Sequence, residues 1–226
     1  MQFTLTGLWG HMGPFAQGIV IMMALMSVFS LVILAERVLF FRASRRHSRR
    51  FAAEMGTLLE NGDFDTAADA KLGKDVGYLG RTIRAGLTAY RTSFSDSREE
   101  AMESVSRSLE RQAQREVQSF KRGLGHLATV ASTAPFVGLL GTTMGIVTAF
   151  EEMGASGAGG IGTISTGISE ALVTTAFGLL VAIPAVMAYN SLQGWVDARA
   201  VDISEASNEF LDAAARALKR SRPSAR

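Results

Sequence analysis

The sequence has no cysteine, and it has only three histidines and four prolines among its 226 residues. Without cysteine, the chain can form no disulfide and offers no thiolate ligand. His11, His47 and His126 stand singly, so no imidazole cluster with metal-ligand spacing arises. We therefore expect neither a metal site nor a cofactor.

Charge is also missing, apart from one glutamate in the third, from three long stretches, although charged residues make up 19% of the chain. Phe15 to Ala35 is the first stretch, the residues between Arg122 and Glu151 form the second, and the third lies between Glu152 and Asp197. A helix that crosses a bilayer needs roughly 20 mostly apolar residues, and each stretch is long enough. Each exceeds the core of a signal peptide and the first has no basic segment before it, so we expect it to be retained.

Lys and Arg are distributed unevenly between the connecting segments. They cluster at 42–50, 121–123 and 219–226, and they are absent from 1–14 and 151–160. Basic residues accumulate on the cytoplasmic side of a membrane, which predicts an N-terminus on the outer side and a cytoplasmic C-terminus.

These observations predict an all-α integral membrane protein with three transmembrane helices, long helices extending into the cytoplasm and an oligomeric helical bundle. The expected segments are a periplasmic segment at 1–14, a first span at 15–41, a cytoplasmic helical loop at 42–123, a second span at 124–150, a periplasmic connection at 151–160, a third span at 161–195 and a cytoplasmic C-terminal helix and tail at 196–226.

The loop reads as helical because it carries capping signals and an apolar period. Ser97 with Glu100 forms the S-x-x-E pattern of a capping box. A stripe at spacings of three and four follows, and we expect this helix to run unbroken into the second span. Its members are Met102, Val105, Leu109, Ala113, Val117, Phe120 and Leu124.

Two weaker helical patterns flank that helix. Asp63 is a plausible cap between two short helices separated at Asn61-Gly62-Asp63. After the third span, an amphipathic helix is allowed by Val201, Phe210, Leu211 and Leu218.

Small residues recur along the second and third spans. Lipid provides little hydrophobic drive for helices to associate, so close packing depends on side chains that let backbones approach. The pattern predicts a tight helix seam rather than the ordinary abundance of small residues in membrane spans. The residues concerned are Gly138, Gly141 and Gly145, followed by Ala171, Thr175, Gly178, Ala182 and Ala185.

Glu170 is the only charged residue between Glu152 and Asp197. A charge at the centre of a bilayer costs about 2.5 to 3.5 kcal/mol on insertion scales, so such a group marks a functional site by default. The carboxyl can change its protonation state as its surroundings alternate between apolar and polar, which is the chemistry of an ion relay. The alternative is a carboxylate near a helix end that snorkels or is capped.

Three threonines could extend a polar lining around Glu170: Thr142, Thr174 and Thr175. Thr174 lies at i+4 and shares the face of Glu170, whereas Thr175 lies on the small-residue row. The alternative is that their hydroxyls only bond back to their own helices.

Other functional classes find little support. The glycine-rich 154–162 lacks the Lys-Ser/Thr ending of a phosphate-binding loop. The basic clusters adjoin membrane spans and contain no nucleic-acid reading motif, so we expect no nucleic-acid partner. A solute transporter is also disfavoured, because the sequence shows no inverted repeat.

"APFVGLLGTTMGIVTAF" (134–150) followed by "GISEALVTTAFGLLVAIPAVMAYN" (167–190) resembles the core of the ExbB/TolQ/MotA proton-channel family, and in particular its ExbB and TolQ branch. The motifs are G-L-x-G-T and E-A-L-x-x-T-A-x-G-L-x-x-A-I-P-A. MotA-like members have four spans, so the three spans expected here depart from that branch.

The resemblance implies a subunit of an energy-transducing complex in a bacterial inner membrane, not an enzyme. In relatives, five copies surround two single-span partner subunits, of ExbD or TolR type, whose helices carry an essential Asp. Carried over by motif position, Thr142, Glu170 and Thr175 would face those helices, and we favour Thr175 over Thr174. The competing hypothesis is a membrane scaffold that conducts nothing. The ion (proton by default, or sodium) and the process powered (nutrient uptake, envelope maintenance or motility) stay open.

Overall fold

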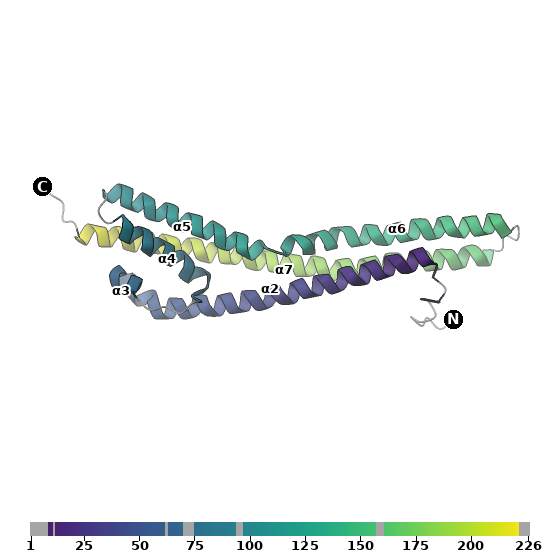
Figure 1. Ribbon diagram of the computed structural model, residues 1–226, viewed down its shortest axis with the longest axis horizontal. Helices are drawn as coiled ribbons and strands as arrows, with labels where there is room; N and C mark the ends of the chain where they lie inside the picture. The colour runs from purple at the N-terminus through teal and green to yellow at the C-terminus, as the bar shows by residue number, and fades with distance from the viewer. Residues whose placement is uncertain are drawn as a thin grey trace. The chain divides into compact units, whose positions relative to one another are not determined.

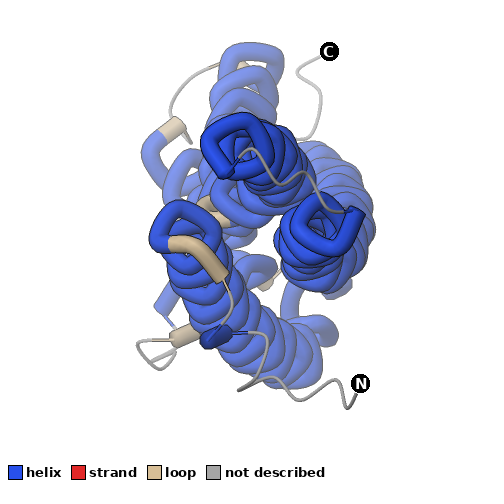
Figure 2. Tube along the Cα trace, turned by 90° about the vertical axis from the view of Figure 1, so that its right-hand side faces the viewer, coloured by secondary structure: helices blue, strands red, loops and turns tan. Residues whose placement is uncertain are grey.

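The computed structural model describes residues 9–10, 12–61, 63–69, 75–93, 97–156 and 161–221. This part of the chain is helical and contains no strand, as predicted (Figures 1 and 2). The helices are α2 (Pro14–Asn61), α3 (Phe64–Asp69), α4 (Gly77–Thr92), α5 (Arg98–Lys121), α6 (Leu124–Ser156) and α7 (Ile161–Ser221).

Three helical segments are long and apolar enough to cross a membrane, which confirms the predicted number of spans. They lie in Pro14–Leu59, Arg98–Ala155 and Gly167–Lys219. The protein is therefore an all-α membrane protein with long helices that continue beyond their apolar parts.

Helix α2 extends well past the predicted first span and ends only at Asn61. Asp63 then accepts a hydrogen bond at its Oδ1 from the backbone N–H of Thr66, 3.3 Å away, which confirms the predicted cap of α3. The expectation of two short helices is half wrong, because the first of them is the end of α2. Gly62 lies outside the described residues.

Helix α4 begins at a glycine that no other residue could replace. Gly77 has a φ of +68° and its Cα lies against Ser48 of α2. A side chain there would be strained by the backbone conformation and would collide with Ser48. The Ser48 hydroxyl accepts a hydrogen bond from the backbone N–H of Leu79 at 3.2 Å, so this close approach joins α4 to α2.

Helix α5 starts with the predicted capping box, in which Ser97 and Glu100 each bond the other's backbone N–H. Its buried face differs from the predicted stripe near the C-terminal end, where Glu116 is buried and Val117 is only partly so.

The expectation that α5 runs unbroken into the second span is wrong. Helix α5 ends at Lys121, Arg122 has a ψ of 131°, and Gly123 has a φ of +83° before α6 starts at Leu124 (Figure 1). Glycine adopts this left-handed conformation at little cost, which makes it the common residue just after a helix. The sequence Lys121-Arg122-Gly123 therefore ends a helix.

Helix α7 carries both the third span and the C-terminal amphipathic segment without interruption, and Pro184 lies inside it. Phe210 and Leu218 are buried and Leu211 is partly buried, but Val201 is 57% exposed. Val201 was therefore assigned to the wrong face, since Val196 and Ile203 are buried instead.

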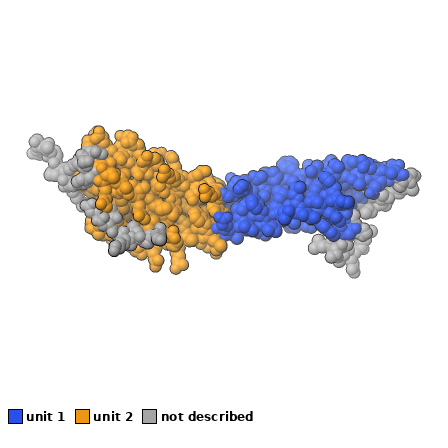
Figure 3. Space-filling model, in the orientation of Figure 1, with its two compact units in different colours: residues 1–36, 123–192 blue, residues 37–122, 193–226 orange. Residues whose placement is uncertain are grey.

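The chain divides into two compact units (Figure 3). Unit 1 comprises residues 1–36 and 123–192, and its core joins Met23 of α2, Ala134 of α6 and Ala182 of α7. Unit 2 comprises residues 37–122 and 193–226, and its core includes Phe51, Leu109 and Phe210.

Candidate functional site

In unit 1, α6 and α7 approach each other so closely that their glycines contact backbone. A Cβ added to Gly178 would lie 2.7 Å from the carbonyl oxygen of Ala134 and 3.1 Å from the Cα of Gly138. A Cβ added to Gly138 would lie 3.0 Å from the Cα of Thr175. Small residues are what permits such an approach between helices in a membrane.

The same contact continues along both helices. A Cβ on Gly141 would lie 2.7 Å from the Cβ of Thr174, and one on Gly145 would lie 3.0 Å from the Cβ of Ala171. Beyond the predicted residues, Gly167 contacts Ala149. We call this contact the glycine seam; it comprises Ala134, Gly138, Gly141, Gly145 and Ala149 of α6 and Gly167, Ala171, Thr174, Thr175 and Gly178 of α7.

The small-residue row of α7 extends past the glycine seam. Ala182 and Ala185 are buried in the core of unit 1, together with Val20 of α2 and Val130 of α6. One face of α7 therefore packs against both other helices of the unit.

Thr174 and Thr175 both bond to one carbonyl oxygen of α6. Each hydroxyl donates to the oxygen of Gly138 at 3.2 Å. The Thr174 hydroxyl also lies 2.7 Å from the carbonyl oxygen of Ala171, and its residue is fully buried. Thr175 is only partly buried.

Thr142 is buried, and its hydroxyl donates to the carbonyl oxygen of Leu139 on its own helix at 2.7 Å. In the single chain, the Thr142 hydroxyl bonds back to its own helix, as the alternative for these threonines predicts. The Thr175 hydroxyl instead bonds to the other helix of the glycine seam.

Glu170 is partly buried and lies one helical turn from Thr174 on α7. Its Oε1 accepts a hydrogen bond from the backbone N–H of Gly13, directly before α2. A backbone amide at a helix start therefore contacts the carboxyl, as in the alternative of a capped carboxylate. No sequence pattern identified this contact, because the two residues are 157 positions apart.

A model of the MotA/TolQ/ExbB proton channel family matches residues 76–205, more than half of the chain. This protein belongs to that family. The match covers α4, α5, α6 and most of α7, and so includes the glycine seam and Glu170.

Individual relatives of the family match shorter parts of the chain. The chain is 43% identical over 95 residues to the Tol-Pal system protein TolQ of Haemophilus influenzae, covering 42% of each chain. It is 51% identical over 75 residues to the biopolymer transport protein ExbB of Xanthomonas campestris pv. campestris, covering 33% of this chain and 30% of the relative. The match spans less than half the length of either relative.

Unit 2 of this family member holds a buried carboxylate that the sequence reading missed. Glu116 accepts from Arg81 Nε at 2.7 Å and from its Nη2 at 2.6 Å, and Gln112 Nε2 donates to it at 2.7 Å. The hydrogen bond to Glu116 raises the pKa of the Arg81 guanidinium. Bidentate pairs of this kind fix orientation as well as charge, and this one joins α4 to α5.

A second polar cluster joins α4 to α7. The Tyr78 hydroxyl donates to Asp202 Oδ2 at 3.0 Å, and Arg199 lies 2.9 Å from the same oxygen. Burial and the hydrogen bond to Asp202 raise the pKa of Tyr78.

Aromatic rings surround this cluster. Phe41 stacks on Trp195 at 3.9 Å between ring centroids, and Phe120 meets both rings edge-on. These contacts pin α2, α5 and α7 together within unit 2.

The described residues contain no group of three His, Cys, Asp or Glu side chains that could hold a metal ion. In the apolar part of α7, the polar groups beside the glycine seam include the Glu170 carboxyl and the hydroxyls of Thr174 and Thr175.

Proposed function

We propose that this protein is the ion-conducting subunit of an energy-transducing complex in a bacterial inner membrane. It uses proton motive force to drive mechanical work through a single-span partner, without covalent catalysis. The work serves transport, envelope maintenance or surface motility. In this proposal the N-terminus is periplasmic, the loop at 42–123 is cytoplasmic, and the spans lie at 15–41, 124–150 and 161–195.

The observation that carries the proposal is the position of Glu170. It is the only charge in a long apolar part of α7, and it directly precedes Ala171 of the glycine seam. A carboxyl retained in such surroundings is costly and accepts or releases a proton according to what lies opposite. The backbone N–H of Gly13 donates a hydrogen bond to this carboxyl, so a polar partner reaches it in the single chain.

Thr175 is the better candidate than Thr174 for the pathway. Thr174 is fully buried in the glycine seam, and its hydroxyl contacts two backbone carbonyl oxygens. Thr175 is only partly buried, so a lone pair of its hydroxyl can face an ion or a partner. Thr142 would join them by rotating its hydroxyl away from Leu139.

The partners we propose are further copies of this chain, five in all, around ExbD- or TolR-like helices that supply an Asp in trans. The outer surface of unit 1 supports an environment of lipid and neighbouring helices, because large apolar side chains are exposed on all three of its helices. On α6 and α7 they include Phe136, Leu139, Leu140, Leu172, Leu179, Leu180 and Ile183.

A membrane scaffold is the second candidate. It is favoured by the back-bonded hydroxyls of Thr142 and Thr174 and by the tightness of the glycine seam, which would serve assembly alone.

Ion flux distinguishes the two candidates. The protein, purified with its single-span partner, is placed in liposomes and challenged with a pH difference while an internal dye reports proton entry. We expect Glu170→Gln to abolish the flux with the complex still assembled. Glu209→Gln is the matched control, because Glu209 is an exposed carboxylate farther along α7.

Equal flux in wild type and Glu170→Gln would refute the relay, and no flux in the complete wild-type complex would favour the scaffold. Flux that a sodium gradient alone drives, and that Glu170→Gln abolishes, would support the relay but identify the ion as sodium.

A further inference from the structure

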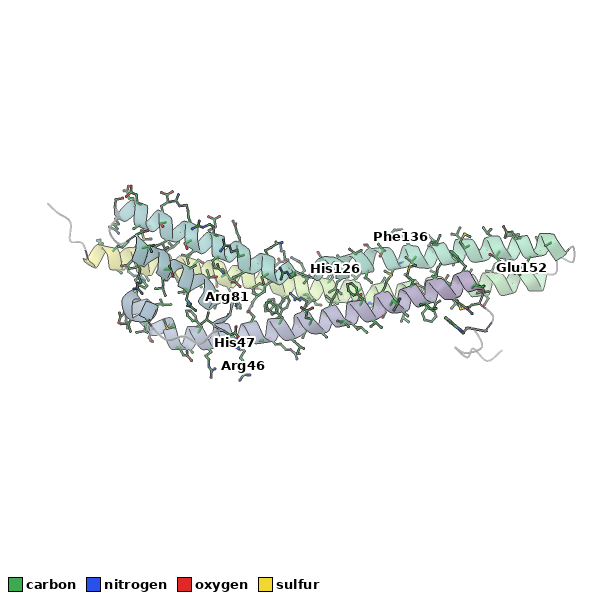
Figure 4. All side chains as sticks on the ribbon, in the orientation of Figure 1. Arg46, His47, Arg81, His126, Phe136 and Glu152 are labelled. Atoms are coloured by element: carbon green, nitrogen blue, oxygen red, sulfur yellow. The ribbon has the colours of Figure 1, made fainter. Side chains whose placement is uncertain are left out.

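Helix α2 exposes a dense row of arginines just after its apolar part. We call it the arginine face; it comprises Arg42, Arg45, Arg46, Arg49 and Arg50. All five are exposed, and Figure 4 shows Arg46 projecting outward from α2. The face lies entirely in unit 2.

The side of α2 opposite the arginines is buried against other helices of unit 2. The arginines therefore face outward. Phe41, Ser44, Ser48 and Phe51 are buried at spacings of three and four. Phe41 stacks on Trp195 and Ser48 bonds to α4. The helix therefore cannot turn the arginines inward without breaking these contacts.

The charge of the face is largely uncompensated. No acidic residue occurs in the sequence between Glu36 and Glu54. Arg50 lies 3.6 Å from Glu54 in an exposed pair, which adds little. Within the described part of the chain, no ion pair involves the other four arginines.

The face begins directly after the last large apolar side chain that α2 exposes. Leu39 is 66% exposed and lies three residues before Arg42. Leu39, Arg42, Arg46 and Arg49 recur at spacings of three, four and three, so they share one side of the helix. At about 1.5 Å per residue, Arg42 lies roughly 4.5 Å and Arg46 roughly 10 Å beyond Leu39.

With Leu39 placed at the edge of the hydrocarbon region, Arg42 lies at the depth of the lipid phosphates and Arg46 lies just beyond them. The headgroup region of one leaflet is roughly 5 to 8 Å thick, and arginine side chains extend along the helix to reach it. A guanidinium also binds phosphate oxygens bidentately.

We propose that the arginine face is a binding surface for the phosphate groups of anionic phospholipids. The membrane lipid is favoured over a nucleic acid or an acidic protein because Arg42 follows the exposed apolar side chain of Leu39 within one turn, on the same side of α2. The surface holds α2 at a fixed depth and does not depend on ion conduction.

The test compares lipid selectivity in membranes containing the full protein. Spin-labelled phosphatidylglycerol and phosphatidylcholine are added in turn to phosphatidylcholine bilayers, and the protein-bound fraction of each label is measured. The face variant carries Arg42→Gln, Arg46→Gln and Arg49→Gln. The control variant carries Arg84→Gln, Arg107→Gln and Arg111→Gln, which removes the same charge from exposed positions on α4 and α5.

We expect wild type and the control variant to prefer phosphatidylglycerol, and the face variant to lose that preference by roughly fivefold or more, since each arginine at an anionic surface contributes about that factor. If the face variant does not fold, the wild-type preference must still fall with added salt, because exposed charges are screened.

Unchanged selectivity in the face variant, equal loss in the control variant or a salt-independent preference would overturn the proposal. So would wild-type binding of an RNA oligonucleotide that the face variant loses while its lipid preference is intact.

Discussion

Unit 1 and unit 2 hold their helices together in opposite ways. Unit 1 packs glycine against backbone and exposes large apolar side chains, whereas unit 2 buries aromatic rings and ion pairs and exposes charge. Among the large apolar residues exposed in the described part of the chain, only Leu39 and Val201 belong to unit 2. The difference indicates two solvents: in lipid the backbone approach stabilises the contact, and in water the burial of rings does.

The largest expected effect on stability comes from comparing a phenylalanine of unit 2 with a phenylalanine of unit 1. Phe120→Ala removes a fully buried ring that contacts Phe41, Tyr78 and Trp195, and we expect a loss of about 3 to 5 kcal/mol in unfolding free energy. Phe136→Ala, at a ring that is 70% exposed and projects outward from α6, should change stability little in detergent (Figure 4). Denaturation followed by circular dichroism measures both, and similar losses would break the comparison.

The next largest effect on stability concerns the close approach of α6 and α7 in the glycine seam. Gly178→Ala places a methyl group 2.7 Å from the carbonyl oxygen of Ala134, so the helices must separate. We expect a loss of about 1 to 3 kcal/mol, typical of overpacking. Gly125→Ala is the control, because its Cβ would meet nothing within 4 Å and should be neutral or stabilising. The melting temperature should fall for Gly178→Ala and should stay or rise for Gly125→Ala, and an equal fall in both would argue against the glycine seam.

A smaller effect depends on pH and belongs to unit 2 alone. Burial and Asp202 raise the pKa of Tyr78 above its ordinary 10.0, so the folded chain keeps a proton that the unfolded chain releases. The resulting stability is complete below pH 10 and is lost as the pH rises through the folded-state pKa. Unfolding free energy measured against pH should decline at alkaline pH, and Tyr78→Phe should flatten this decline. An identical alkaline profile in Tyr78→Phe would show that another group is responsible.

The smallest effect is at Gly56, which lines a cavity of about 430 Å³ between α2, α4 and α7 in unit 2. A Cβ there meets nothing within 4 Å, so Gly56→Ala should stabilise the helix by about 0.5 to 1 kcal/mol. We expect a small rise in melting temperature. A fall would indicate that filling part of the cavity destabilises the fold.

The spans, the helix caps and the small-residue rows were predictable because each depends on residues close in sequence. Ser97 and Asp63 bond to backbone three residues away. The break at Gly123 was missed because the apolar period of α5 continued through it, although glycine after a basic last turn was a usable signal.

Contacts between distant segments were beyond such patterns. Glu116 lies next to Val117 on the predicted stripe, and its burial depends on Arg81, 35 residues away. The amide of Gly13 reaches Glu170 across 157 residues. The residues of the candidate pathway could be named from the sequence, but which threonine bonds to which carbonyl could not.

The most direct test of the central proposal is whether Glu170 changes its protonation state. Infrared difference spectra of the membrane-embedded complex, recorded as the pH is stepped, report the C=O stretch of a carboxylic acid. We expect a carboxylic-acid band in wild type that is absent in Glu170→Gln and unaffected in Glu209→Gln. Identical difference spectra in wild type and Glu170→Gln would contradict the relay.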